Sequence, residues 1–141
     1  MSCVKDIVQQ RELFSVEEHQ SVAEVARKMS DLRGGAILVF DRDQLRGVFS
    51  ERDLLKRVVV ERRDPESTPV SLVMSTGMFT IDESASLEEA MESMQVHNCR
   101  HLPVTRQGRV VAFLSMRDLM NFELAQKTDE IHHMRQYISN A

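Results

Sequence analysis

An internal repeat constrains the fold of this chain more than any other feature. When the 141-residue sequence is aligned with itself at an offset of 65 residues, residues 13–55 match residues 78–120 without a gap, and 10 of the 43 pairs are identical. Chance pairing at average composition would give roughly two or three identities. A unit of about 60 residues buries little apolar surface alone. The sequence therefore predicts two small modules that pack against each other.

Each copy contains a predicted amphipathic helix. Apolar residues recur at helical spacing over residues 22–29 and again over 87–94, which indicates one buried face. Before each stretch stands a serine followed three positions later by a glutamate. This pattern predicts a capping box, in which the hydroxyl and the carboxylate each bond a backbone N–H. The two pairs are Ser21 with Glu24, and Ser86 with Glu89.

Strands surround that helix in both copies. A short extended piece precedes it, and two strands joined by a turn follow it, at residues 36–40 and 45–49 and at the positions offset by 65. A second helix opens at Ser50 or Ser115, which completes the order β-α-β-β-α. We therefore predict an α+β fold of two βαββα modules packed as a pseudo-two-fold pair.

Domain limits follow from the breaks between these patterns. Residues 61–70 hold two prolines and a run of charged residues, which is typical of a linker. We expect the first module at residues 1–64, the second at 65–123 and a C-terminal helix at 124–141. In that last segment Leu124, Ile131 and Ile138 recur every seven residues, with Met134 on the same stripe. The stripe predicts packing either on its own module or on a second subunit.

Composition and charge exclude several classes of protein. The longest apolar run, residues 36–40, is far shorter than the roughly 18 residues that span a bilayer, and no secretory signal is visible at the N-terminus. The net charge of −4 argues against binding to a nucleic acid polymer. Two cysteines, Cys3 and Cys99, cannot build a disulfide framework, so we expect a cytoplasmic protein.

Motifs of catalysis are scarce, whereas one polar motif occurs twice. The sequence has no P-loop, no GxGxxG, no HExxH and no CxxC, so we expect a protein that is not an enzyme. The repeated motif is Ser-x-Arg-Asp-Leu, after the last strand of each copy. Its serine and aspartate would cap a helix. The same groups could bind a ligand, because helix amides hold phosphate and a carboxylate accepts both hydroxyls of a ribose. A catalytic trio of His101, Ser115 and Asp118 is the enzyme alternative, without a spacing that fixes its geometry.

The chain from about residue 4 to 124 resembles a tandem pair of CBS domains, the Bateman module. The motifs that carry the resemblance are Gly/Ala-x-x-Ser-x-x-Asp at residues 47–53 and 112–118, and Arg-His-Leu-Pro-Val at residues 100–104. The resemblance implies a regulatory module that binds AMP, ATP or NAD(H) between the halves and signals to a protein target by rearranging them. It also implies a homodimer. Independently of the resemblance, we expect no metal. The alternative is a structural or oligomerisation module whose clefts are empty.

The resemblance assigns site residues position by position. The motif aspartates would hold the ribose, the motif serines would approach phosphate, and basic residues nearby are candidate phosphate partners. The adenine would be lined by the segment at the first strand of a module and by the stretch that leads into the strand after its first helix. Because the second copy holds a threonine and the Arg-His-Leu-Pro run, we expect it to be the main adenine platform. The full set is Ser15, Ala36, Ile37, Ser50, Arg52, Asp53, Lys56, Met78, Thr80, Arg100, His101, Leu102, Pro103, Ser115, Arg117 and Asp118.

The two copies differ at positions that matter for such a site. Ala112 stands where the motif usually has a glycine, and Leu38 stands where the second copy has Pro103. Unequal binding by the halves is therefore expected. His97, Cys99 and His101 form a separate alternative, a metal-responsive or redox-responsive site, although structural zinc is normally held by four ligands.

Overall fold

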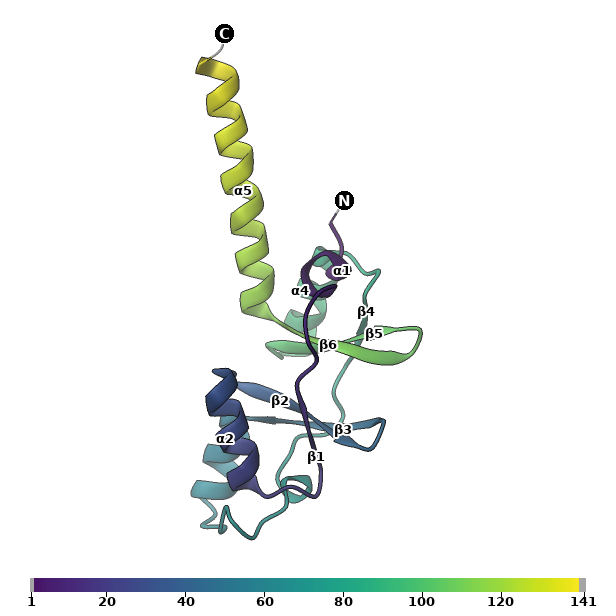
Figure 1. Ribbon diagram of the computed structural model, residues 1–141, viewed down its shortest axis with the longest axis vertical. Helices are drawn as coiled ribbons and strands as arrows, with labels where there is room; N and C mark the ends of the chain where they lie inside the picture. Colours follow the sequence, from purple (N-terminus) through teal and green to yellow (C-terminus); the bar gives the residue numbers. More distant parts are fainter. Residues whose placement is uncertain (1, 140–141) are drawn as a thin grey trace.

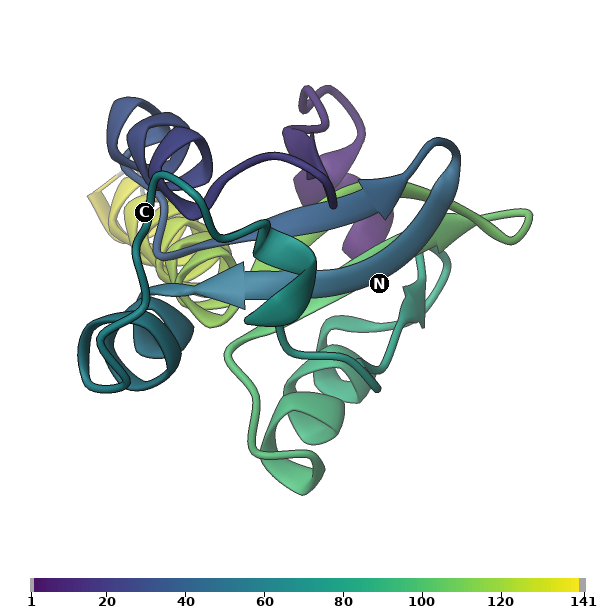
Figure 2. The same ribbon diagram turned by 90° about the horizontal axis from the view of Figure 1, so that it is seen from below.

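The computed structural model describes residues 2–139 and confirms the α+β pair of βαββα modules. The two modules are stacked along the long axis of the molecule, and Figure 2 shows the sheet of one lying over the sheet of the other. Two short helices, α1 (Val4–Val8) and η2 (Val70–Leu72), precede the halves. The first half comprises β1 (Ser15–Glu17), α2 (Val22–Leu32), β2 (Ala36–Asp41), β3 (Gln44–Ser50), α3 (Glu51–Asp53) and η1 (Leu54–Val59). The second comprises β4 (Ile81–Asp82), α4 (Leu87–Val96), β5 (His101–Arg106), β6 (Arg109–Ser115) and α5 (Met116–Ser139).

The two sheets repeat the same topology and register. In each, the first strand is parallel to the second, and the second is antiparallel to the third. Ala36 pairs with Ser50, and His101 pairs with Ser115, so equivalent residues lie side by side at the end of each hairpin. Both hairpins carry a bulge at the equivalent place, after Val39 and after Val104. The repeat therefore sets the position of each Ser-x-x-Asp motif at the end of its sheet.

Helix capping differs in part from the prediction. The hydroxyls of Ser21 and Ser86 accept the expected backbone bonds, from the N–H groups of Glu24 at 3.2 Å and Glu89 at 3.0 Å. The Glu24 carboxylate, however, accepts from the side chain of Gln20, so this box is only half formed. Reciprocal boxes occur instead at the two Ser-x-x-Asp motifs, where the aspartate carboxylate accepts from the serine N–H and the serine hydroxyl accepts from the aspartate N–H.

The segment that precedes each module in the sequence contributes to the hydrophobic core of the other module. Val4 and Val8 of α1 are buried in the core of the second module, and Val4 N–H donates to the carbonyl of Ala85. Val70 and Val73 are buried in the core of the first module. The domain limits at residues 1–64 and 65–123 stay a prediction. In the structure, the core of each module is completed by the segment that precedes the other module in the sequence. The chain between α1 and β1 consequently runs across the seam.

Helix α5 is one continuous helix of 24 residues rather than a separate segment that begins at residue 124. Its first turns pack on the second module, and the rest projects away from the body (Figure 1). Ile131, Met134 and Ile138 are exposed along this projecting part. Residues 140 and 141, the end of the predicted helix, lie outside the described residues. Between residues 2 and 139 no helix combines the length and apolarity needed to cross a bilayer.

Candidate functional site

A cleft of about 390 Å³ lies at the seam between the modules, next to the second Ser-x-x-Asp motif. One wall comes from the first half, at the end of α2 and the start of β2, and the other comes from β5, β6 and the start of α5. The chain between α1 and β1 closes the side. The lining residues are Arg11, Glu12, Phe14, Leu32, Gly34, Gly35, Ala36, Ile37, His101, Phe113, Ser115 and Asp118.

Asp118 is the polar centre of this cleft. Its Oδ2 accepts hydrogen bonds from the N–H of Ser115 and from the guanidinium of Arg11, each at 2.8 Å. Burial raises the pKa of the Asp118 carboxyl, but the bonds from Arg11 and Ser115 outweigh it and leave this pKa below its ordinary value. The carboxylate is therefore charged at neutral pH. Among the described residues, no protein donor is recorded on its second oxygen, Oδ1, which can accept from a ligand.

His101 provides the aromatic part of the cleft. Its ring stacks on Phe113, with a centroid separation of 4.9 Å. Burial lowers the pKa of His101, and this effect outweighs the opposing effect of the Asp118 charge. The neutral imidazole is favoured near pH 7, so the cleft offers a flat, uncharged surface beside a carboxylate. Such a pair of features suits a ligand that joins an aromatic base to a diol.

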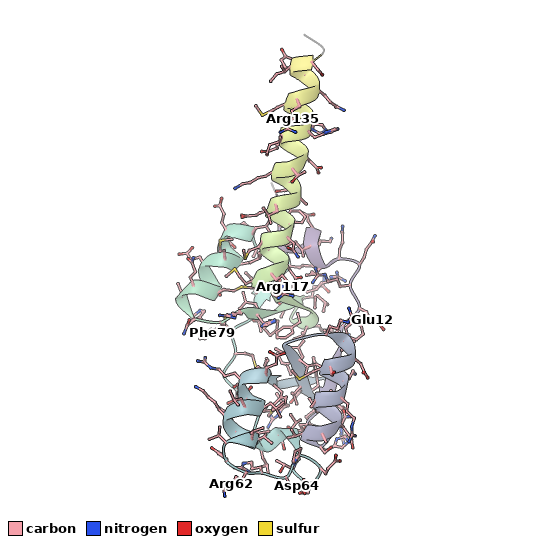
Figure 3. The ribbon with its side chains drawn as sticks, turned by 90° about the vertical axis from the view of Figure 1, so that its left-hand side faces the viewer. Glu12, Arg62, Asp64, Phe79, Arg117 and Arg135 are labelled. Carbon is pink, nitrogen blue, oxygen red and sulfur yellow. The ribbon has the colours of Figure 1, made fainter. Side chains whose placement is uncertain are left out.

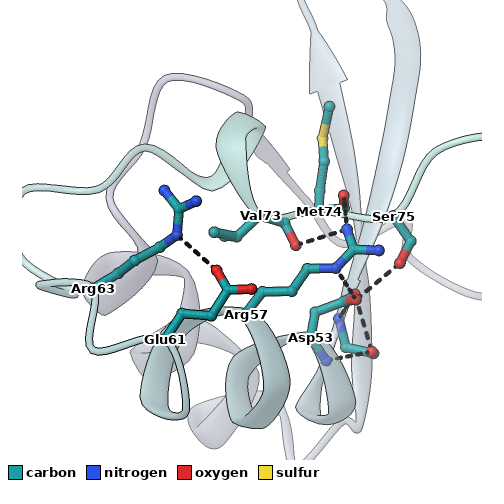
Figure 4. Close-up of polar contacts among 8 residues, drawn as sticks. Asp53, Arg57, Glu61, Arg63, Val73, Met74 and Ser75 are labelled. Atoms are coloured by element: carbon teal, nitrogen blue, oxygen red, sulfur yellow. Dashed lines mark hydrogen bonds and ion pairs between the residues drawn. The ribbon is translucent and has the colours of Figure 1, made fainter.

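The equivalent aspartate, Asp53, lies in different surroundings (Figure 4). Its Oδ2 accepts from both the N–H and the hydroxyl of Ser50 at 3.0 Å, and its Oδ1 accepts from the Ser75 hydroxyl at 2.8 Å. Arg57 lies 3.8 Å away and donates to the Met74 carbonyl at 2.7 Å. The side chain of Asp53 is 9% exposed, whereas that of Asp118 is 19% exposed. Both oxygens of Asp53 are thus used by the protein itself.

This asymmetry has a clear cause in the sequence. At the offset of 65 residues, Ser75 corresponds to Gln10, and Arg57 corresponds to Phe122. Phe122 packs against the apolar core of the second module and makes no polar contact with Asp118. The expectation of unequal ligand binding by the halves stays a prediction, and the residues that separate Asp53 from Asp118 are not the ones on which it was based.

The structure brings together five of the predicted site residues in the lining of the cleft. These five are Ala36, Ile37, His101, Ser115 and Asp118, of which Ile37 is almost fully buried. Ser50 and Asp53 cap the other helix, and Leu102 and Pro103 are buried in β5. As ligand contacts, all of these stay predictions. The other predicted site residues do not line the cleft. Of these, the exposed ones are Arg52, Lys56, Thr80, Arg100 and Arg117, and the partly exposed ones are Ser15 and Met78.

Sequence reasoning missed Arg11, which supplies the closest basic group to Asp118. The residue precedes the repeat, and its offset partner is Thr76, so self-alignment gives no signal for it. The basic residues that were singled out, such as Arg52 and Arg117, stand next to the motif in sequence but outside the lining of the cleft.

The metal alternative receives no support from the geometry of residues 2–139. His97 ends α4 and stacks on Phe79 with a centroid separation of 3.4 Å, whereas His101 faces the cleft. No group of three or more His, Cys, Asp or Glu side chains in this part of the chain is placed to hold a metal ion. Both cysteines are free, and burial raises the pKa of the Cys99 thiol, which disfavours the reactive thiolate.

Comparison with known proteins places this fold and motif in a family. The family model for the CBS domain matches residues 4–60 and 70–125, and the chain therefore belongs to the CBS-domain proteins. It is 35% identical over 119 residues to the CBS domain-containing protein YhcV of Bacillus subtilis, covering 84% of each chain.

Solved structures show the same architecture. A protein with CBS domains from Burkholderia ambifaria matches with a TM-score of 0.83 and 29% identity, over 88% of this chain and 95% of that one. The CBS domain protein PAE2072 from Pyrobaculum aerophilum, solved in complex with AMP, matches with a TM-score of 0.76 and 28% identity, over 89% of this chain and 99% of that one. The resemblance seen in the sequence is thereby confirmed.

Proposed function

We propose that this chain is a regulatory sensor that binds an adenosine nucleotide in the Asp118 cleft and is not an enzyme. The observation that carries the proposal is the position of Asp118, a charged carboxylate with one oxygen open, in a cleft lined by both modules. AMP, ATP and NAD(H) are the candidate ligands. AMP has the most support, because a relative of the same fold was solved with it.

The chemistry of the cleft fits such a ligand. A ribose diol can donate two hydrogen bonds to a carboxylate, and charge-assisted bonds of this kind are the strong ones. The backbone beside Gly34 and Gly35 leaves room for a flat base, because neither residue has a side chain. A volume of about 390 Å³ lies within the range of sites for small molecules.

Signalling would follow from the shared lining. The two walls of the cleft belong to different modules, so a ligand that contacts both favours one relative arrangement over others. Differential affinity for two arrangements is what allows a ligand to shift their populations. A protein target in the cytoplasm would then recognise the favoured arrangement. We propose that neither a nucleic acid polymer nor a membrane is a partner of this chain.

We further propose that the receptor is a homodimer. Figure 3 looks at the face on which helices of both modules lie, with η1 and α2 below and α4 and α5 above. Two of these helices, η1 and α5, carry exposed apolar side chains at equivalent positions, namely Leu55 and Met120 at 57% and 53%, and Val59 and Leu124 at 61% and 62%. A pseudo-two-fold face of this kind suits a second copy of the same chain, because dimer interfaces are self-complementary.

Calorimetric titration with AMP, ATP and NADH tests the proposed function. Wild-type protein should bind at least one of them, and Asp118→Asn should weaken that binding strongly. Asp82→Asn is the matched control, because Asp82 is an exposed aspartate in β4 that does not line the cleft. Absence of binding to folded wild-type protein would instead support the structural module with empty clefts. Chromatography after incubation detects turnover, which would favour an enzyme.

A further inference from the structure

Arg11 occupies an unusual position in the fold. It follows α1, whose valines are buried in the second module, and its N–H donates to the Val8 carbonyl at 3.0 Å. The chain then continues into β1 of the first module. Arg11 is therefore anchored beside the second module while it belongs to the segment that crosses the seam. Its guanidinium meets Asp118 at the mouth of the cleft.

The contact with Asp118 places Arg11 in competition with a ligand. The Arg11 guanidinium lies 2.8 Å from Oδ2 of Asp118 and is 42% exposed, so it can move without disturbing a core. A ribose diol that uses both carboxylate oxygens of Asp118 must share Oδ2 with Arg11 or displace it. A displaced guanidinium stays in the cleft as a cation without its carboxylate partner.

The charges of the cleft decide which ligand can make this exchange. Of the residues that line it within the described chain, Arg11 is the one lysine or arginine, and the carboxylates are those of Glu12 and Asp118. The remaining titratable group, His101, favours its neutral form, because burial lowers its pKa. A neutral ligand would break the ion pair between Arg11 and Asp118 and offer the guanidinium no anionic partner in its place. An anionic ligand would replace the lost partner.

We infer that Arg11 selects adenosine ligands that carry a phosphate over neutral or sulfonium adenosines. The inference rests on the proposed function and adds the specificity of its site. The ribose takes the Asp118 carboxylate, and the released guanidinium pairs with the phosphate, as an arginine does readily through two parallel N–H donors. The equivalent residue near Asp53 is Thr76, so this selection belongs to one cleft.

A titration that compares AMP with adenosine tests the inference, because the two ligands share the base and the diol and differ in the phosphate. Wild-type protein should prefer AMP by about tenfold or more, the factor expected for one charge-assisted pair. Arg11→Ala should bring this ratio close to one, by weakening AMP binding and strengthening adenosine binding. Arg11→Lys should keep part of the preference, because it keeps the charge.

The test also needs a control variant at an arginine outside the cleft. Arg27→Ala removes an exposed arginine whose ion pair with Glu66 lies outside the cleft, so it should leave the ratio unchanged. Thermal unfolding of each variant establishes that it is folded. AMP binding with an unchanged ratio in Arg11→Ala would overturn this inference and leave the proposed function standing. Failure of wild-type protein to bind either ligand would overturn both.

Discussion

The Ser75 hydroxyl donates a hydrogen bond of 2.8 Å to Oδ1 of Asp53 and ties the first motif of the chain to the segment after the linker. Ser75 also pairs with Val48 of β3 through two backbone bonds, so its position is fixed by the sheet. In this structure Asp53 therefore holds the segment that contains Ser75, whereas Asp118 keeps an open oxygen.

Loss of the Ser75 hydroxyl should therefore destabilise the fold. Ser75→Ala leaves one oxygen of a buried carboxylate without its donor, which costs about 1–3 kcal/mol. Urea unfolding measures the change. Thr76→Ala, at the exposed neighbouring position, should change the free energy of unfolding by less than about 0.5 kcal/mol. Equal effects of the two substitutions would contradict this role of Ser75.

Gly47 should not tolerate a side chain. A Cβ at this position would lie 2.6 Å from the Ser75 carbonyl oxygen, which belongs to the backbone of the exchanged segment. We expect Gly47→Ala to cost about 1–3 kcal/mol, the usual range for overpacking. Gly34→Ala is the comparison, because the closest atom there is at 3.6 Å. The prediction fails if both variants unfold at the same temperature.

The Asp118 carboxylate should make stability depend on pH in the acid range. Burial raises the pKa of this carboxyl, but the hydrogen bonds from Arg11 and Ser115 lower it by more than burial raises it. The folded pKa therefore lies below the ordinary value of 3.8. The carboxylate therefore stabilises the fold above pH 3.8, and this contribution is lost as the pH falls through the folded pKa. The difference in stability between wild type and Asp118→Asn should shrink in acid. A difference that grows as pH falls would have the wrong sign.

The exposed apolar pairs of η1 and α5 should hold the dimer together. Leu55→Asp or Leu124→Asp places a charge on this face without touching a core, so the modules should fold and the dimer should dissociate. Sedimentation velocity measures the change in mass. Leu72→Asp is the control, since Leu72 is 63% exposed but lies on η2 rather than on η1 or α5. Dissociation by the control alone would place the interface elsewhere.

Much of this fold could be predicted because the repeat carries its own pattern. The helical stripes, the hairpins and the positions of Ser50 and Ser115 at the sheet ends all follow from residues 13–55 and their copies. Equivalent registers in the two sheets explain why this worked, since a strand cannot shift by one residue without turning its apolar face outward.

The exchange of segments could not be predicted in the same way. Residues 4–8 and 70–73 precede the aligned part of each copy, and either pair of valines could fill either core. The contacts that separate the two aspartates come from this region as well. Arg11 and Ser75 have offset partners of a different type, so the alignment that found the repeat could not indicate which carboxylate would stay open.

A crystal structure of the protein grown with AMP would show directly whether the Asp118 cleft binds the nucleotide. We expect the ligand at the seam, with both ribose hydroxyls within hydrogen-bond distance of the Asp118 carboxylate and the base between the start of β2 and His101. Asp53 should keep its bond from Ser75 in the same crystal. AMP bound at Asp53 alone, with the Asp118 cleft unchanged, would contradict the proposed site.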